Sequence, residues 1–260
     1  MSSMNLHCIG DSHTAFFTGY NVIQPEYPQS FTSIVKNIYT YRLGSSLAYN
    51  LCESNSRTKS RQKLFEIIDT LNYKTDILLL SFGEVDCRAH VIKQAELKNI
   101  TIEDAVKECI LRYMLIIKEL KDLKFKIVVW NAVPTAMGFE NVKFEYPYYG
   151  TYEQRNKACI LFNEELQKKS TKNDFIFISV YKLIISKNLK TNEKFYFDKI
   201  HLGNRLLPYT LKIIKDKIPQ FKTQKIEILK IQIRILFNYI KMEKKTDRFI
   251  NSVKKIFTKY

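Results

Sequence analysis

Two short segments of consecutive apolar residues constrain the fold of this chain more than any other feature. Leu78–Leu80 and Ile127–Trp130 show no alternation between apolar and polar residues. Strands with this pattern are covered on both faces, which is typical of parallel sheets that carry helices on both sides. The chain is therefore expected to fold as an α/β domain, with layers of helices around a central, mostly parallel sheet.

Strand-like and helix-like segments alternate along residues 1–218, as this architecture requires. Strands are predicted at Asn5–Gly10, Ile38–Leu43, Asp76–Phe82, Lys124–Asn131 and Asp174–Val180. Helices are predicted at Ser46–Cys52, Ser60–Leu71, Ile102–Leu123, Tyr152–Lys169 and Leu206–Ile218. Thr101, followed three residues later by Asp104, is a suitable start for the longest of these helices.

The composition excludes several classes of protein. Of the 260 residues, 45% are hydrophobic and 26% are charged, which is ordinary for a globular domain and excludes wholesale disorder. No apolar run approaches the roughly 18 residues of a membrane span, and the amino-terminal residues do not have the pattern of a secretory signal. Five cysteines without a CxxC pair fit reduced thiols better than disulfides or a zinc site. We therefore expect a cytoplasmic protein.

Half of the net charge of +16 lies at the carboxyl end of the chain. Residues 219–260 contain nine Lys and two Arg against two Glu and one Asp, and apolar residues recur in them at helical spacing. This pattern predicts a basic amphipathic helix, Ile226–Tyr260, as an extension of a domain formed by residues 1–218. The helix could pack on its own domain or on a partner, or lie on an anionic membrane at the inner face. Nucleic acid is the least favoured partner, because no recognition motif accompanies the charge. The pattern does not indicate an oligomeric state.

Residues with catalytic potential follow the first strand and precede the last helix of the domain. Ser12, in Gly10-Asp11-Ser12-His13, is placed at the carboxyl edge of the sheet, where α/β proteins form their sites. Asp198 and His201 are three residues apart and can project to the same side of a turn. The carboxylate can then fix the imidazole tautomer while the other ring nitrogen faces a hydroxyl. Ser12, His201 and Asp198 therefore supply a nucleophile, a general base and an orienting carboxylate.

These motifs, in this order, resemble the SGNH (or GDSL) hydrolase superfamily over nearly all of residues 5–205. Gly44 stands where that family places an oxyanion-hole glycine, and Gly83-Glu84-Val85-Asp86 where it has Gly-x-Asn-Asp. The resemblance implies a three-layer, flavodoxin-like fold and hydrolysis or transfer of an ester acyl group, with no cofactor and no metal. It also implies that the backbone N–H groups of Ser12 and Gly44 hold the oxyanion.

One departure from the family concerns the oxyanion hole. Val85 stands where the family has an asparagine, and removal of one such donor typically costs about 10²–10³ in rate. Arg88 follows in the same loop and could replace that donor or bind an anionic substrate group. Alternatively, Arg88 and His90 could pair structurally with Glu84 or Asp86. The string from Phe82 to His90, FGEVDCRAH, resembles a superfamily variant associated with bacterial surface-glycan biosynthesis.

The sequence thus predicts a serine esterase or acyltransferase that acts on carbohydrate O-acyl groups, with O-acetyl expected, in surface polysaccharide biosynthesis. The substrate is expected to contact His13, Arg88, His90, Tyr148 and Tyr149, with the aromatic segment 139–152 as a platform for sugar rings. The alternative is a catalytically silent module that binds glycan or serves as a membrane-associated scaffold, which the absence of the asparagine favours.

Two further interpretations of the same residues are less favoured. His13, His90, His201, Asp11, Asp86 and Asp198 could converge on a metal, but they lack the short ligand spacings of known metal motifs. The segment Gly44–Ala48 approximates the GxSxG motif of α/β-hydrolases, with Ser46 as nucleophile. In that fold the acid and the histidine usually come from separate loops, so the spacing of three between Asp198 and His201 favours Ser12. Ser46 is expected to begin a helix instead.

Overall fold

One six-stranded sheet forms the centre of the molecule. The computed structural model describes residues 4–29, 31–138, 147–186, 188–222 and 227–237. The strands are β1 (Asn5–Gly10), β2 (Phe31–Thr32), β3 (Ile38–Arg42), β4 (Asp76–Ser81), β5 (Lys126–Trp130) and β6 (Ile176–Ile178). Their order is β2-β3-β1-β4-β5-β6, and all neighbours are parallel except β2, which is antiparallel to β3. The predicted α/β fold with a mostly parallel sheet is confirmed.

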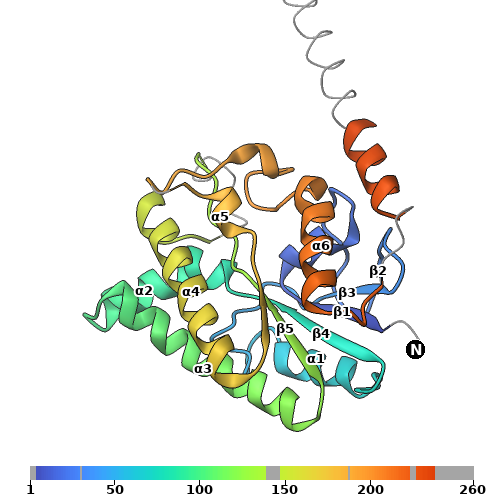
Figure 1. Cartoon of the computed structure of the whole chain (residues 1–260). Helices are drawn as coiled ribbons and strands as arrows, with labels where there is room; N and C mark the ends of the chain where they lie inside the picture. Colours follow the sequence, from blue (N-terminus) through green and yellow to red (C-terminus); the bar gives the residue numbers. More distant parts are fainter. Residues whose placement is uncertain (1–3, 30, 139–146, 187, 223–226, 238–260) are drawn as a thin grey trace, which may run out of the picture.

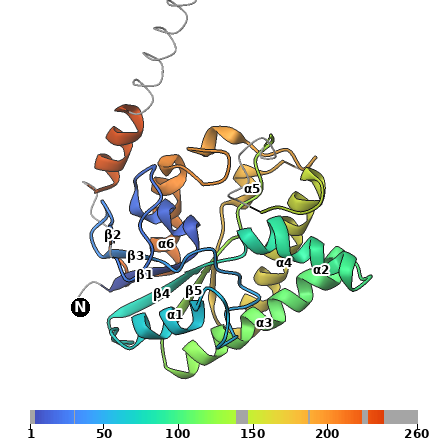
Figure 2. The ribbon, with the colours of Figure 1, turned by 180° about the vertical axis from the view of Figure 1, so that it is seen from behind.

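Helices cover both faces of this sheet (Figures 1 and 2). One face carries α1 (Ser60–Ile68), α2 (Val91–Leu97), α3 (Ile102–Asp122) and α4 (Tyr152–Asn173); the other carries α5 (Tyr181–Ile184), α6 (Leu207–Lys217) and the 3₁₀-helix η1 (Ser12–Thr18). Strand β4 supplies Leu78 and Leu80 to the first core and Ile77 and Leu79 to the second, and all four side chains are fully buried. Burial on both faces explains the continuous apolar run in the sequence.

The predicted helix Ser46–Cys52 is wrong, because this segment forms turns. The buried carboxylate of Asp86 holds it: Oδ2 accepts the N–H of Ala48 at 2.8 Å and Oδ1 accepts that of Tyr49 at 3.0 Å. Asp86 itself begins a π-helix, Asp86–His90, which continues into α2. Neither this π-helix, nor α2, nor the short strand β2 was predicted.

The first part of the predicted carboxyl-terminal extension packs on the domain. Residues 227–237 form a helix, whereas Ile226 and residues 238–260 of the predicted helix lie outside the described residues. Phe221 and Ile231 are fully buried in the core beneath α6, and Glu227 Oε1 accepts the backbone N–H of Lys36 at 2.8 Å. Within the part of the chain that the structure describes, no helix is both long and apolar enough to cross a membrane.

Candidate active site

Ser12 lies at the point where β1 ends and η1 begins. A side chain at Gly10 could not be accommodated, because its Cβ would lie 2.0 Å from the carbonyl oxygen of Ser81 on β4. The glycine lets the chain turn there, and Asp11 donates its N–H to the same carbonyl at 3.1 Å. Asp11 then caps η1 by accepting the N–H of His13 at 2.8 Å. The local sequence therefore fixes the Ser12 backbone at the carboxyl end of β1.

The structure brings Ser12, His201 and Asp198 together in one hydrogen-bonded series. His201 Nε2 lies 2.8 Å from Ser12 Oγ, and His201 Nδ1 lies 2.7 Å from Asp198 Oδ2. The other carboxylate oxygen, Asp198 Oδ1, accepts the N–H groups of Ile200 and His201 at 2.7 and 2.6 Å. This turn is why a spacing of three residues places the carboxylate beside the imidazole.

The surroundings of the series place a proton on His201 Nδ1, between that nitrogen and the Asp198 carboxylate. Burial raises the pKa of Asp198, but the hydrogen bond from His201 outweighs this and holds that pKa below its usual value. An ionised Asp198 accepts the Nδ1 proton, which leaves Nε2 to accept the Ser12 hydroxyl. The His201 side chain is only 1% exposed and stacks against Phe197, with ring centroids 5.7 Å apart. This geometry can transfer the Ser12 proton to His201.

A second buried histidine–carboxylate pair lies behind His201. The His13 ring is 4.9 Å from that of His201, and His13 Nε2 is 3.4 Å from Glu84 Oε2. The other Glu84 oxygen accepts a hydrogen bond from Arg88 Nε at 2.7 Å. Burial raises the pKa of Glu84, but the Arg88 charge and His13 outweigh it and hold that pKa at about 2. Burial lowers the pKa of His13 despite Glu84, so this histidine is neutral at pH 7.

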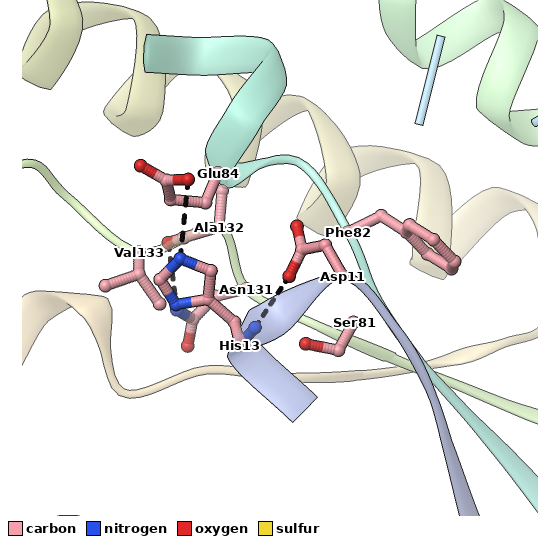
Figure 3. Close-up of a pocket in the computed structure, with 8 residues that line it drawn as sticks. All are labelled: Asp11, His13, Ser81, Phe82, Glu84, Asn131, Ala132 and Val133. Carbon is pink, nitrogen blue, oxygen red and sulfur yellow. Dashed lines mark hydrogen bonds and ion pairs between the residues drawn. The ribbon is translucent and has the colours of Figure 1, made fainter. Parts of the chain in front are cut away.

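Figure 3 shows this pair in a narrow, closely packed polar recess that has no room for a water molecule. Its lining consists of Asp11, His13, Ser81, Phe82, Glu84, Asn131, Ala132 and Val133. Burial raises the pKa of Asp11 well above its ordinary value, and the nearby Glu84 charge raises it further.

The predicted substrate contacts are only partly placed at an accessible surface. His13 and Arg88 are 3% and 4% exposed, so neither presents a surface to a substrate in this structure. Arg88 instead pairs with Glu84 and donates to the carbonyl of Pro147, which is the structural pairing considered as the alternative. His90 packs against Tyr49, with ring centroids 4.3 Å apart.

Tyr148 and Tyr149 are exposed, at 44% and 37%. Residues 139–146 of the predicted aromatic platform lie outside the described residues. The two tyrosines are thus the accessible part of that platform within the structure.

The Gly44 loop adjoins the Ser12 loop. Leu43 donates its N–H to the Gly10 carbonyl at 2.8 Å, so Gly44 follows directly after a contact with β1. Gly44 has φ of +94°, a conformation that favours glycine. The loop is held farther along by Asp86, whose pKa burial raises to about 6 despite the N–H groups of Tyr49 and Ala48. Sequence reasoning missed these two hydrogen bonds, because Asp86 is 38 positions from Ala48 and 37 positions from Tyr49 in the chain.

Neither alternative site is formed. Ser46 is fully buried and bonds to Ser60 Oγ at 2.6 Å and the Leu43 carbonyl at 3.3 Å, so it is not an exposed nucleophile. The six proposed metal ligands do not converge either: among the residues placed in the structure, no three His, Cys, Asp or Glu side chains form a group suited to a metal ion.

A scan against models of protein families finds no match, and a search of curated proteins finds none either. Solved structures do match. The native aryl esterase of M. smegmatis gives a TM-score of 0.52 at 12% identity, covering 85% of this chain and 100% of that one. A gut microbial diltiazem-metabolizing enzyme gives 0.51 at 14% identity over 83% of this chain and 48% of that one, about half of its length. A GDSL-like lipase from Bacteroides thetaiotaomicron gives 0.49 at 13% identity, covering 83% and 88%. The first two matches establish that this chain shares the fold of those two enzymes.

Proposed function

We propose that this chain is an SGNH-type serine esterase or acyltransferase that acts on carbohydrate O-acyl groups, with O-acetyl as the expected group. The observation that carries the proposal is the series from Ser12 Oγ through His201 to Asp198, with separations of 2.8 and 2.7 Å. The same three roles, in hydrogen-bond contact, define serine acyl transfer on unrelated folds. The fold shared with an esterase is in keeping with this chemistry.

In the proposed reaction, Ser12 Oγ attacks the acyl carbonyl while His201 Nε2 takes its proton. His201 then gives that proton to the leaving sugar hydroxyl, and the acyl group remains on Ser12. Water or a second sugar hydroxyl attacks the acyl-serine next, with His201 again as base and then acid. The acceptor alone decides between hydrolysis and transfer.

The oxyanion is assigned to the backbone N–H groups of Ser12 and Gly44. Val85 supplies no side-chain donor where the resembled family has asparagine, and the Arg88 guanidinium is engaged by Glu84 and Pro147. We therefore replace the predicted direct role of Arg88 in the oxyanion hole with a positioning role, through Glu84 and His13. Loss of the asparagine is expected to leave a slower enzyme than its full-donor relatives.

The carbohydrate substrate and the place of action belong to the proposal as well. Exposed Tyr148 and Tyr149 offer flat apolar faces of the kind that pack against sugar C–H groups. We place the protein in the cytoplasm at the inner membrane face, in surface polysaccharide biosynthesis. The helix of residues 227–237 supports membrane contact, because Leu229, Ile233, Leu236 and Phe237 are 44–66% exposed at helical spacing.

A catalytically silent, glycan-binding module is the second candidate, and Val85 is the observation that favours it. A fluorophosphonate probe separates the two, because it labels only an activated serine. The proposal predicts labelling of the purified protein that disappears in Ser12→Ala. It also predicts that Ser12→Ala and His201→Ala each lower the hydrolysis of a small acetyl ester by about 10³ or more. Labelling that persists in Ser12→Ala, or is absent from the natural chain, would exclude the serine mechanism.

A further inference from the structure

A basic cavity lies beside the Gly44 loop. Its volume is about 550 Å³, and it is lined by Glu26, Gly44, Ser45, Arg57, Thr58, Lys59 and Lys63. Pockets for small molecules typically have about 300–1,000 Å³. Three of the four charged side chains in this wall are cationic, so the cavity is suited to an anionic group.

The cavity is close to the proposed nucleophile. Arg42 at the end of β3 is in register with Gly10 at the end of β1, and Gly44 and Ser12 each follow this pair by two residues. Neighbouring strands in a sheet are about 4.8 Å apart. Leu43 donates its N–H to the Gly10 carbonyl at 2.8 Å, so the Gly44 wall of the cavity begins beside the end of β1, two residues before Ser12. A substrate held by its ester at Ser12 can extend into the cavity.

Two of the cations in this wall are not neutralised. The Glu26 carboxylate is already matched by Lys63 Nζ at 2.5 Å and by Arg42 at 3.9 Å. Arg57 and Lys59 are exposed, and their side chains have no carboxylate or other acceptor among the residues that the structure describes. Their charge is thus available to a ligand.

Lys59 is an unfavourable residue for stability at its position. Its backbone has φ of +51°, in the left-handed region that favours glycine or asparagine. It also precedes the first turn of α1 without a capping hydrogen bond, where Ser, Thr, Asn or Asp is preferred. Lysine adds a positive charge at the cavity wall. The amino-terminal end of α1 adds a partial positive charge at the same place.

We infer that this cavity binds an anionic part of the substrate, a phosphate or carboxylate group carried by the acylated molecule. The inference rests on the proposed function, because it assigns the cavity to the molecule whose ester meets Ser12. It narrows the substrate class to acyl esters that bear a negative charge near the ester. Acylated sugars with phosphate or carboxylate substituents belong to that class.

Three small acetate esters that differ in charge test the inference. The anionic probes are 4-acetoxyphenyl phosphate and 4-acetoxybenzoate, and the neutral one is 4-acetoxybenzamide. The double variant Arg57→Gln/Lys59→Asn removes both free charges, and asparagine suits the left-handed backbone, so folding should be preserved. The ratio of kcat/KM for an anionic over the neutral probe should fall roughly 3- to 30-fold in this variant. The preference of the natural chain should also weaken with added salt. Lys74→Gln, an exposed charge before β4, is the matched control and should change no ratio.

The two anionic probes distinguish phosphate from carboxylate. The probe whose kcat/KM ratio falls more in the double variant carries the group that the cavity binds. Equal ratios in the natural chain and the double variant would overturn the inference and leave the proposed function intact. Binding of phenyl phosphate to Ser12→Ala, measured by calorimetry, is independent of turnover. If no ester is hydrolysed, the proposed function fails. In that case the anion site is still supported if phenyl phosphate binds and the substitutions Arg57→Gln/Lys59→Asn weaken this binding. Absence of that binding together with unchanged ratios excludes it.

Discussion

The buried ion pair between Glu84 and Arg88 permits a quantitative test of how the site is held together. The two side chains are 5% and 4% exposed, with Arg88 Nε 2.7 Å from Glu84 Oε1. Glu84→Gln leaves the Arg88 charge buried without a counter-charge, which typically costs about 3–5 kcal/mol. For a domain of this size, that loss lowers the melting temperature by roughly 6–20 °C. Thermal and urea unfolding followed by circular dichroism measure the change.

A double-mutant cycle separates the pair from its surroundings. Arg88→Met should also destabilise the protein, because the buried Glu84 then loses its permanently charged partner and keeps only His13. The double variant should lose less stability than the two single variants lose together. Each single variant leaves one buried charge without its partner, whereas the double variant leaves neither charge. Arg61 and Glu119 form the matched control pair: they are joined by two hydrogen bonds of 2.8 and 2.6 Å but are 26% and 40% exposed.

Glu119→Gln in this control should cost no more than about 1 kcal/mol, because solvent screens the pair. If Glu84→Gln costs no more than Glu119→Gln, the reasoning about the buried charge is refuted. The cycle also separates two roles for Arg88. A contact with the oxyanion would lower kcat with little change in melting temperature, whereas the ion pair with Glu84 requires a large loss of stability.

Three further predictions concern other parts of the molecule. Burial raises the pKa of Asp86 to about 6, so the stabilisation by its protonated form is complete below about pH 4 and is lost as the pH rises through 6. The free energy of unfolding should fall by up to about 3 kcal/mol over this range. If the same pH dependence of stability persists in Asp86→Asn, Asp86 is not its source. Gly44→Ala places a side chain at φ +94°, a conformation that disfavours alanine, and so disturbs the Gly44 loop. The variant should have a lower kcat for a small acetyl ester but should still be labelled by the fluorophosphonate probe. An unchanged kcat would show that the Gly44 loop is not part of the proposed oxyanion hole. Truncation after Ile218 should give insoluble or unfolded protein, because it removes buried Phe221. Truncation after Phe237 removes a basic segment and should weaken salt-sensitive sedimentation with anionic liposomes. Equal sedimentation of the natural and shortened chains would argue against membrane contact through residues 238–260.

Features that depend on local sequence could be predicted closely. The predicted strand Asn5–Gly10 matches β1 at both ends, because Gly10 marks the turn and the buried side chains of the strand, apart from His7, are apolar. The predicted helix start at Thr101 is confirmed, since Thr101 Oγ1 accepts the N–H of Asp104 at 3.1 Å. Asp198 and His201 are brought together within one turn by backbone hydrogen bonds to the Asp198 carboxylate. In each case the interacting groups lie within a few residues of one another.

Features that depend on distant partners could not be predicted. Nothing in Ser46–Cys52 itself opposes a helix; Asp86, on another element, holds its N–H groups in turns. The contact between His13 and Glu84 joins the loops after β1 and β4, and it converts a predicted substrate contact into a buried pair. The charges of Arg57 and Lys59 are typical of a solvated loop in the sequence. Only the placement of that loop against Gly44 makes them the wall of a cavity.

The buried groups beside His201 also explain why an ion pair is retained there. In the proposed acyl transfer His201 becomes positively charged, 4.9 Å from the His13 ring. Arg88 offsets the Glu84 charge, and a Glu84 without that partner would favour a protonated His13. Two unit charges 4.9 Å apart repel by about 3 kcal/mol at an effective dielectric constant of 20.

Arg88→Met should therefore lower kcat roughly a hundredfold at pH 7, because a protonated His13 opposes the charge that forms on His201. Glu84→Gln should also lower kcat, since it leaves the Arg88 cation uncompensated. The double variant has neither charge and should recover part of the rate. Assays below the lowest melting temperature of the series separate this effect from unfolding. A double variant slower than both single variants would show that Glu84 and Arg88 act on catalysis other than through the charge of His13.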